Sequence, residues 1–467
     1  MKRILLILLT PVLLHAQNFR KSLYDSIMQA EVSLNGFNGN VLVAKSGKIL
    51  FRKSYGYRNY DTKELLDSNS VFELASISKQ FTAIGILQLM EAGKLKLTDS
   101  LRQFFPELPY GNITIQHLLT HTSGLPAYDD EMAVKWNHGK IAYNRDVISF
   151  LSTQKPAIHF KPGEKWEYSN TAFVLLASII ENVSGVSFKD YTDQNIFKPL
   201  NMQHTRVYNS RRSSKEIIPD YAYGFVFSDS LKRYMLPDSL ITYDFVIYLD
   251  GVEGDGIINT TTGDLYKWDR MLKNHALISE STQTKMFSPQ STIDSAAQLY
   301  YGYGEMLGTN ELGKYIMHTG GWPGYSTILV RFIKDDITII ILSNNESKTN
   351  SLSGRLAYVA SGKPVVVPYK HIASNMESKG FKKYMGRYLV PNVPMATTFN
   401  LFLKDGIIFG RFEKDTADVE YKPESATKLF HSGGKDQQIE FELDSAGEVQ
   451  KAYYIYGGMK KEITKVN

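Results

Sequence analysis

Three short motifs in this chain of 467 residues combine residue types that can carry out acyl transfer. The first places Ser76 three residues before Lys79, a spacing that brings two side chains together on one face of a helix. The run 81–90 is apolar on nearly every side, so this helix is predicted to be buried. Burial favours the neutral form of an amine, and a neutral amine can accept the proton of a serine that attacks a carbonyl. We therefore predict Ser76 as a nucleophile and Lys79 as its proton partner.

Spacing alone does not select Ser76, because three other serines precede a lysine at the same distance: Ser152, Ser425 and Ser432. Ser152 stands at the end of a predicted helix, just before Pro156, and the other two lie among turn residues of the C-terminal region. Only Ser76 opens a long apolar helix. Taken alone, the motif also fits a serine that caps a helix, followed by a lysine exposed to solvent on the first turn.

The second motif pairs Tyr168 with Asn170, where a polar segment meets an apolar helical run at 173–183. A tyrosine near an ammonium group can move a proton between nucleophile and leaving group, and an asparagine amide can hold a substrate carbonyl. The same Tyr-x-Asn pattern occurs at Tyr57 and Tyr110, but neither tyrosine is predicted to lie at a junction between a loop and a helix. The alternative role for Tyr168 is that of an aromatic side chain anchoring a loop.

The third motif, His-Thr-Gly-Gly at residues 318–321, comes shortly before a strand that is expected to open at Thr327. Glycine at such a place lets a substrate backbone approach closely. A similar sequence begins at His121, but no strand follows it. We interpret His121 as a histidine whose polar atoms are satisfied by loop backbone.

Two hairpins and the helices between them must position these motifs. Residues 40–44 and 49–55 are β-rich runs joined at Ser46-Gly47, and residues 327–333 and 337–342 form a second predicted hairpin. Helices are predicted at 21–34 and 351–359, and a long helical region separates the hairpins. This order predicts an α+β fold in which the first and last segments of the domain share one antiparallel sheet.

A second, smaller domain is predicted after this sheet. A Gly, Pro and Val-rich stretch near residue 363 is typical of a linker, placed at 364–379. Five short alternating runs between turns then indicate a small all-β barrel or sandwich at 380–467. The larger domain is predicted to span 18–363.

The first residues read as a signal peptide at 1–17. Lys2 and Arg3 precede an apolar run at 4–14, and His15-Ala16-Gln17 provides a cleavage neighbourhood. Because that run is shorter than a bilayer span and contains Pro11, we expect cleavage near Asn18, a secreted or periplasmic protein and no stable membrane anchor.

Composition excludes several other classes of function. With no cysteine, the chain has no thiol chemistry and no disulfides. The formal charge of +5 is spread along the sequence, which gives no basic stripe for nucleic acid. No metal-ligand spacing and no phosphate-binding loop are present, so we predict no metal and no cofactor. The oligomeric state is left open.

Taken in this order, the three motifs resemble those of the serine β-lactamases, penicillin-binding DD-peptidases and related esterases and D-aminopeptidases. The resemblance covers residues 19–363, and the segments 114–126 and 254–268 share it. It implies an antiparallel sheet flanked by helices with an all-helical insert, and a Ser76 acyl-enzyme. It also implies a small β domain of the kind that often follows such hydrolases.

The resemblance also implies a role for each matching residue. Ser76, Lys79 and Tyr168 would be catalytic, and the backbone N–H groups of Ser76 and Gly321 would form an oxyanion hole. The residues expected to contact substrate are Asn170, His318, Thr319, Gly320 and Trp322.

His318 departs from the lysine that most of these lactamases and DD-peptidases carry, and histidine is only partly charged near neutrality. This favours a small peptide, amide or ester as substrate, above all a peptide that contains a D-amino acid. The alternatives are a β-lactamase proper, and a non-hydrolytic acyl-binding sensor or cell-wall-binding module on the same fold.

Overall fold

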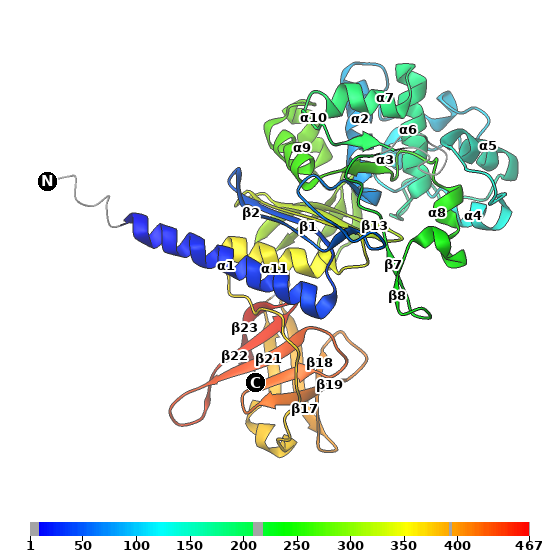
Figure 1. The fold of residues 1–467 in the computed structure, drawn as a ribbon. Coiled ribbons are helices and arrows are strands. Elements are labelled where there is room, and N and C mark those ends of the chain that lie inside the picture. The colour runs from blue at the N-terminus through cyan, green and yellow to red at the C-terminus, as the bar shows by residue number, and fades with distance from the viewer. Residues whose placement is uncertain (1–8, 209–217, 392–394, 467) are drawn as a thin grey trace. The chain divides into compact units, whose positions relative to one another are not determined.

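The computed structural model describes residues 9–208, 218–391 and 395–466 (Figure 1). Contacts divide the chain into two compact units. The sheet unit comprises Phe37–Gly308 and Lys314–Asn350. The barrel unit comprises Met1–Gly36, Thr309–Gly313 and Ser351–Asn467.

The sheet unit is built on an antiparallel sheet of eight strands in the order β10-β11-β12-β13-β14-β15-β1-β2. Both predicted hairpins are present, as β1 with β2 and as β14 with β15. β1 also pairs with β15, with Val41 opposite Ile341, so the two ends of this fold share the sheet as predicted. The strands are Gly39–Lys45 (β1), Lys48–Tyr55 (β2), Ser291–Asp294 (β10), Leu299–Tyr301 (β11), Met306–Asn310 (β12), Gly313–Trp322 (β13), Tyr325–Phe332 (β14) and Ile337–Ser343 (β15).

Helices of the sheet unit surround a core built on α2 (Lys79–Glu91) and α6 (Asn170–Ser184), which pack against each other. Gly85 of α2 permits this approach, because a Cβ there would lie 2.8 Å from the side chain of Ile180. The remaining helices are α3 (Ile115–Leu119), α4 (Tyr128–Lys135), α5 (Asn144–Gln154), α7 (Phe188–Thr192), α8 (Phe245–Tyr248), α9 (Thr262–Asn274) and α10 (Glu280–Met286).

Three small sheets join the loops of the sheet unit. One of them places the strand before Ser76 against a strand from far along the chain, with Phe72 opposite Thr260. The short strands are Tyr57–Asn59 (β3), Glu64–Leu65 (β4), Phe72–Glu73 (β5), Arg206–Val207 (β6), Val226–Ser228 (β7), Arg233–Met235 (β8) and Ile258–Thr260 (β9).

The C-terminal part of the barrel unit is a closed barrel of eight antiparallel strands. The sequence indicated only five of them, and β19, β20 and β23 were missed. Pro423 and a register shift after it interrupt the alternating pattern of β19, which explains one omission. The strands are Gly386–Val390 (β16), Thr397–Lys404 (β17), Ile407–Phe412 (β18), Val419–Ser425 (β19), Lys428–His431 (β20), Gln437–Leu443 (β21), Val449–Tyr456 (β22) and Met459–Val466 (β23).

Among the described residues, the barrel unit contains the α-helices α1 (Leu9–Asn35) and α11 (Thr349–Ser361, from Ser351 onward) and the 3-10 helix Ser378–Tyr384. Buried Arg355 of α11 connects the two α-helices to the barrel, since its guanidinium donates to Glu31 of α1, to Asp436 and to the carbonyl of Gly457. α1 begins well before the predicted residue 21 and runs through the predicted cleavage region, whose processing stays a prediction.

Among the described residues, no single helix has the length and apolar composition needed to cross a bilayer. One pair passes the test together, α6 with the helical stretch Phe188–Phe197, bent by 79°. Both members of this pair contribute to the core of the sheet unit.

Candidate active site

Ser76 lies in a single turn of 3-10 helix, Ala75–Ser78, immediately before α2. The prediction placed Ser76 on the same helix as Lys79, whereas α2 itself begins at Lys79. Ala75 has a left-handed backbone with φ of 49°, a conformation that costs energy for a residue with a Cβ. The turn leaves the Ser76 N–H at a helix start, where backbone N–H groups have no partner within the helix. The same N–H is the oxyanion donor predicted above.

Lys79 is fully buried and its Nζ points at the candidate nucleophile. It donates to Ser76 Oγ at 3.1 Å, to Asn170 Oδ1 at 2.9 Å and to the backbone carbonyl of Asp255 at 2.8 Å. These three acceptors use all three N–H groups of an ammonium. Lys79 is therefore fixed in one position beside the serine hydroxyl.

Tyr168 and Asn170 lie at a junction between loop and helix, as predicted. Ser169 is the N-cap of α6, and its Oγ accepts the N–H of Ala172. The ring of Tyr168 faces Lys79, with Nζ 4.9 Å from the ring centroid. This contact places the phenol ring beside the amine that binds Ser76.

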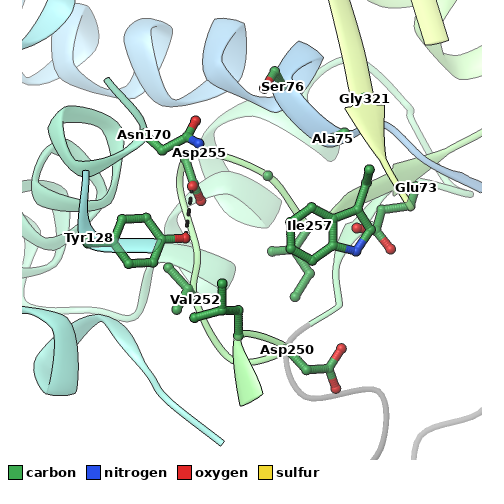
Figure 2. Close-up of a pocket in the computed structure, with 13 residues that line it drawn as sticks. Glu73, Ala75, Ser76, Tyr128, Asn170, Asp250, Val252, Asp255, Ile257 and Gly321 are labelled. Carbon is green, nitrogen blue, oxygen red and sulfur yellow. Dashed lines mark hydrogen bonds between the residues drawn. The ribbon is translucent and has the colours of Figure 1, made fainter. Parts of the chain in front are cut away.

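A solvent-open pocket of about 510 Å³ lies in front of Ser76 (Figure 2). Of the predicted residues, Ser76, Asn170, Gly321 and Trp322 line it. The full lining is Glu73, Ala75, Ser76, Tyr128, Asn170, Leu249, Asp250, Val252, Asp255, Gly256, Ile257, Gly321 and Trp322. Fully buried Lys79 and partly exposed Tyr168 are outside the lining, as are His318, Thr319 and Gly320.

Asp255 is a pocket residue that sequence reasoning did not single out. Its carboxylate accepts the Tyr128 hydroxyl at 3.1 Å, and both side chains lie next to Asn170 in Figure 2. Burial raises the pKa of Asp255 to about 6, opposed by the charge of Lys79 and reinforced by Asp129. Burial likewise raises the pKa of Tyr128 well above its usual value. The motif Gly-Asp-Gly at 254–256 was a signal, but it carries no spacing rule that assigns a role to the aspartate.

Gly320 and Gly321 differ sharply in their surroundings. A Cβ on Gly320 would lie 2.0 Å from the carbonyl oxygen of Leu74, which also accepts a hydrogen bond from Thr327 Oγ1 at 2.8 Å. A Cβ on Gly321 would meet nothing within 4 Å. Gly320 therefore lets β13 approach the segment before Ser76, and Gly321 leaves open space where a substrate backbone would lie.

His318 sits inside β13, since residues 318–321 belong to that strand and do not merely precede the next one. The imidazole is almost fully buried and donates from Nδ1 to the carbonyl of Thr319 at 2.7 Å. Its Nε2 then accepts the hydroxyl of Tyr301 at 3.1 Å. Burial and the charge of Lys79 lower the pKa of His318 to about 3. The side chain is thus a neutral group at physiological pH, in contrast to the partly charged one expected.

The described residues contain no group of three or more His, Asp or Glu side chains arranged to hold a metal ion. The site brings together a serine, an amine, a phenol and an amide.

Comparison with known proteins agrees with this geometry. The Beta-lactamase family profile matches residues 28–362. Penicillin-binding protein 4* of Bacillus subtilis is 38% identical over 451 residues, which cover 94% of this chain and 97% of the relative.

Two solved structures show the same fold. The octameric penicillin-binding protein homologue of Pyrococcus abyssi has a TM-score of 0.64 and 24% identity over 94% of this chain and 99% of its own. The D-amino acid amidase of Ochrobactrum anthropi, complexed with L-phenylalanine amide, has a TM-score of 0.61 and 21% identity over 73% of this chain and 99% of its own. With a family match over most of its length and a penicillin-binding relative aligned nearly end to end, this chain belongs to the Beta-lactamase family and is a serine hydrolase.

Proposed function

We propose that the chain hydrolyses an amide or ester through an acyl-enzyme on Ser76. The observation that carries this proposal is the buried Lys79 Nζ, held 3.1 Å from Ser76 Oγ by two further hydrogen bonds. Positioning of a base at this distance is what general-base activation of a serine requires.

In the proposed reaction, Lys79 first releases one proton to solvent, which leaves a lone pair on Nζ. Ser76 Oγ then forms a bond to the substrate carbonyl carbon while its proton passes to Nζ of Lys79. The N–H groups of Ser76 and Gly321 stabilise the oxyanion. The bond to the leaving group then breaks, and Tyr168 supplies the proton that the leaving group takes and regains one from Lys79. Water attacks the resulting ester, and its proton returns through the same groups as Ser76 is released.

We propose an amino-acid amide or peptide with a free amino group, such as a D-aminoacyl amide, as the substrate class. The lining of the described pocket includes the carboxylate of Asp255 and no Lys, Arg or His. A negative lining favours a cationic group on the substrate. The neutral state of His318 supports the same conclusion, because it offers no cation for a substrate carboxylate. Trp322 and Ile257 supply an apolar wall for a side chain.

Covalent labelling tests the nucleophile directly. A fluorophosphonate probe is expected to label the wild-type protein at Ser76 and to leave Ser76→Ala unlabelled. Ser152→Ala is the matched control, since Ser152 carries the same Ser-x-x-Lys spacing but its hydroxyl bonds only within its own helix, to the Ser149 carbonyl. Labelling of a folded Ser76→Ala protein to the wild-type level would refute the assignment.

A hydrolysis screen with four substrate types separates this proposal from its alternatives. Nitrocefin, D-alanyl-D-alanine peptides, D-aminoacyl anilides and p-nitrophenyl esters are compared, with Ser76→Ala as the blank. We expect the D-aminoacyl anilides to have the highest kcat/KM. Nitrocefin turned over far faster than the rest would identify a β-lactamase, and labelling with no steady-state turnover of any substrate would identify a non-hydrolytic sensor.

We also propose that the chain is exported and cleaved near Asn18. Lys2, Arg3 and the apolar run at 4–14 support this. Expression in a bacterial host followed by fractionation and intact-mass measurement tests it. Retention of residues 1–17 on protein recovered from the cytoplasm would contradict the proposal.

A further inference from the structure

His121, from the loop after α3, brackets Tyr168 with two hydrogen bonds. Its backbone carbonyl accepts the N–H of Glu167 at 2.9 Å, and its Nδ1 accepts the N–H of Ser169 at 3.0 Å. One residue therefore fixes the main chain on both sides of Tyr168. The second bond also fixes the residue that precedes Asn170.

The other contacts beside Tyr168 are made by side chains, since Glu167 binds His159 and Lys165, and Ser169 Oγ caps α6. Residues 161–169 contain no helix or strand. Among the described residues, the Tyr168 hydroxyl has no hydrogen-bond partner, so the position of the phenol depends on its backbone and on ring contacts. The His121 ring provides the nearest of these, with its centroid 4.4 Å from that of Tyr168.

His121 is itself held rigidly. Its backbone is left-handed, with φ of 55°, a conformation that persists only where the surroundings impose it. The imidazole is fully buried and packs against Tyr301 at 4.5 Å and Phe173 at 5.1 Å between ring centroids. Such a side chain transmits a defined geometry to whatever it binds.

The hydrogen bond to Ser169 requires one form of the ring. An Nδ1 that accepts a hydrogen bond cannot carry a proton, so the ring must be neutral with its proton on Nε2. The surroundings favour this neutral form, because burial, and after it the charge of Lys79, lowers the pKa of His121 well below its usual value. The other titratable rings against it, Tyr168 and Tyr301, are phenols that bring no positive charge. Nε2 is buried without a hydrogen-bond partner in the described part of the chain, so the acceptor at Nδ1 is the only polar contact of the ring.

We propose that His121 is a positioning residue for the reaction: as a neutral acceptor it sets the Tyr168 phenol and the Asn170 amide at their distances from Lys79 and Ser76. The inference rests on the acyl-enzyme chemistry proposed above. The proposal gives His121 a role in the reaction, whereas the sequence of residues 121–124 alone indicated only a histidine bound to loop backbone.

Three substitutions separate the acceptor from the bulk of the ring. His121→Asn keeps an acceptor oxygen near the place of Nδ1, His121→Gln moves it one carbon further, and His121→Leu removes it. We expect the acylation rate with a p-nitrophenyl ester to fall 10- to 100-fold in the Leu and Gln variants, with KM changed less than threefold, because a misplacement of about 1 Å is sufficient for such a loss. The Asn variant is expected to recover most of the rate.

His117→Asn is the matched control. His117 also accepts a backbone N–H at its Nδ1, that of Thr114 at 3.2 Å, but it caps α3 and does not contact Tyr168. We expect the His117→Asn variant to be acylated at the wild-type rate. A folded His121→Leu protein that acylates within twofold of wild type would overturn the proposal. If the Leu variant does not fold, equal rates in the Asn and Gln variants would overturn it.

The wild-type protein offers a second test that needs no substitution. Two-dimensional ¹⁵N NMR of histidine-labelled protein is expected to show His121 with an unprotonated Nδ1 and a protonated Nε2 from pH 5 to 8. A proton on Nδ1 in that range would overturn the proposal whatever the rates. Failure of fluorophosphonate to label Ser76 would refute the hydrolase mechanism and leave this measurement unaffected, so the two failures are distinguishable.

Discussion

At the scale of single residues, the site depends on charges and hydrogen bonds buried behind the pocket surface. The sequence predicted Ser76, Lys79, Tyr168 and Asn170 as site residues from the order and spacing of a motif, and the contacts of Lys79 bring these four side chains together. It was not sufficient to find Asp255, whose environment is created by residues more than a hundred positions away, such as Tyr128. A charge on a pocket wall has no local sequence signature.

Lys79 should be indispensable for acylation. Lys79→Met removes the base and the three hydrogen bonds that fix it. We expect the acylation rate to fall by about 100- to 10,000-fold, the usual contribution of a general base. Stopped-flow measurement with a p-nitrophenyl ester checks this. Lys155→Met is the control, because Lys155 is exposed and follows Ser152 at the same Ser-x-x-Lys spacing, and its acylation rate should equal that of wild type. A Lys79→Met rate within tenfold of wild type would assign the base elsewhere.

Asp255 should give the reaction a dependence on pH. Its pKa is about 6, so the carboxylate that attracts an ammonium group forms only as the pH rises through that value. We expect kcat/KM for a D-phenylalanyl anilide to increase between pH 5 and 7. The kcat/KM of the N-acetylated anilide, which has no ammonium group, is expected to lack this increase. Asp255→Asn should abolish the difference. A pH profile that is the same for both anilides would contradict the role.

The same shift predicts an effect of opposite sign on stability. The folded-state pKa of about 6 exceeds the ordinary value of 3.8, so between these values the folded protein holds a proton that the unfolded chain has released. The stability that this proton provides is complete below about pH 4 and is lost as the pH rises through 6. Asp255→Asn should therefore stabilise the protein at pH 7.5, by on the order of 2 kcal/mol, and much less at pH 4.5. Calorimetry at both pH values tests this, and a lower Tm at pH 7.5 would count against it.

At the scale of elements, hairpins and apolar helices were predictable because periodicity and turn residues are local. The 3-10 turn at Ala75–Ser78 was not, since it depends on strained Ala75 and on the packing of β13 against Leu74. Strand β19 was missed where Pro423 breaks the alternation. Local patterns thus predicted the scaffold, and long-range contacts decided the shape of the site.

Gly320 and Gly321 of β13 provide a test at this scale. Gly320→Ala would place a methyl group 2.0 Å from the Leu74 carbonyl, so β13 or the Ser76 turn must move. We expect a loss of stability of about 1–3 kcal/mol, typical of overpacking, together with loss of acylation. Gly321→Ala has free space around its new methyl group and should fold normally. Urea unfolding and fluorophosphonate labelling of both variants check this, and equal stability of the two would contradict it.

At the scale of the whole molecule, the composition and turn pattern indicated two parts, and the structure has two compact units. The sequence placed the boundary between the two domains at the linker 364–379, after the last helix of the sheet region. Contacts in the structure instead group α1 and α11 with the barrel. The reason is Arg355, which pairs with Glu31 and Asp436. These partners lie 324 and 81 positions away along the chain, so they cannot be paired with Arg355 from the sequence.

Arg355 should be the main polar link within the barrel unit. Arg355→Ala leaves Glu31 and the Gly457 carbonyl without their partner, and loss of one member of a buried ion pair typically costs about 3–5 kcal/mol. We expect the Tm of the barrel unit to fall by several degrees in calorimetry. Arg387→Ala is the control, because Arg387 is exposed and forms a single ion pair with Glu413 at 3.4 Å, worth less than about 1 kcal/mol. Equal effects of the two substitutions would argue against the link.

The position of Trp322 has an optical consequence. The chain contains four tryptophans, and Trp322 is the one among them that lines the pocket, where its ring meets Phe245 at 5.4 Å between centroids. Trp268, by contrast, is buried against Phe81 in the core. An acyl group that arrives on Ser76 changes the surroundings of the Trp322 indole and not those of Trp268. The protein therefore carries its own fluorophore beside the nucleophile, and its emission can report acylation and release in real time with substrates that have no colour.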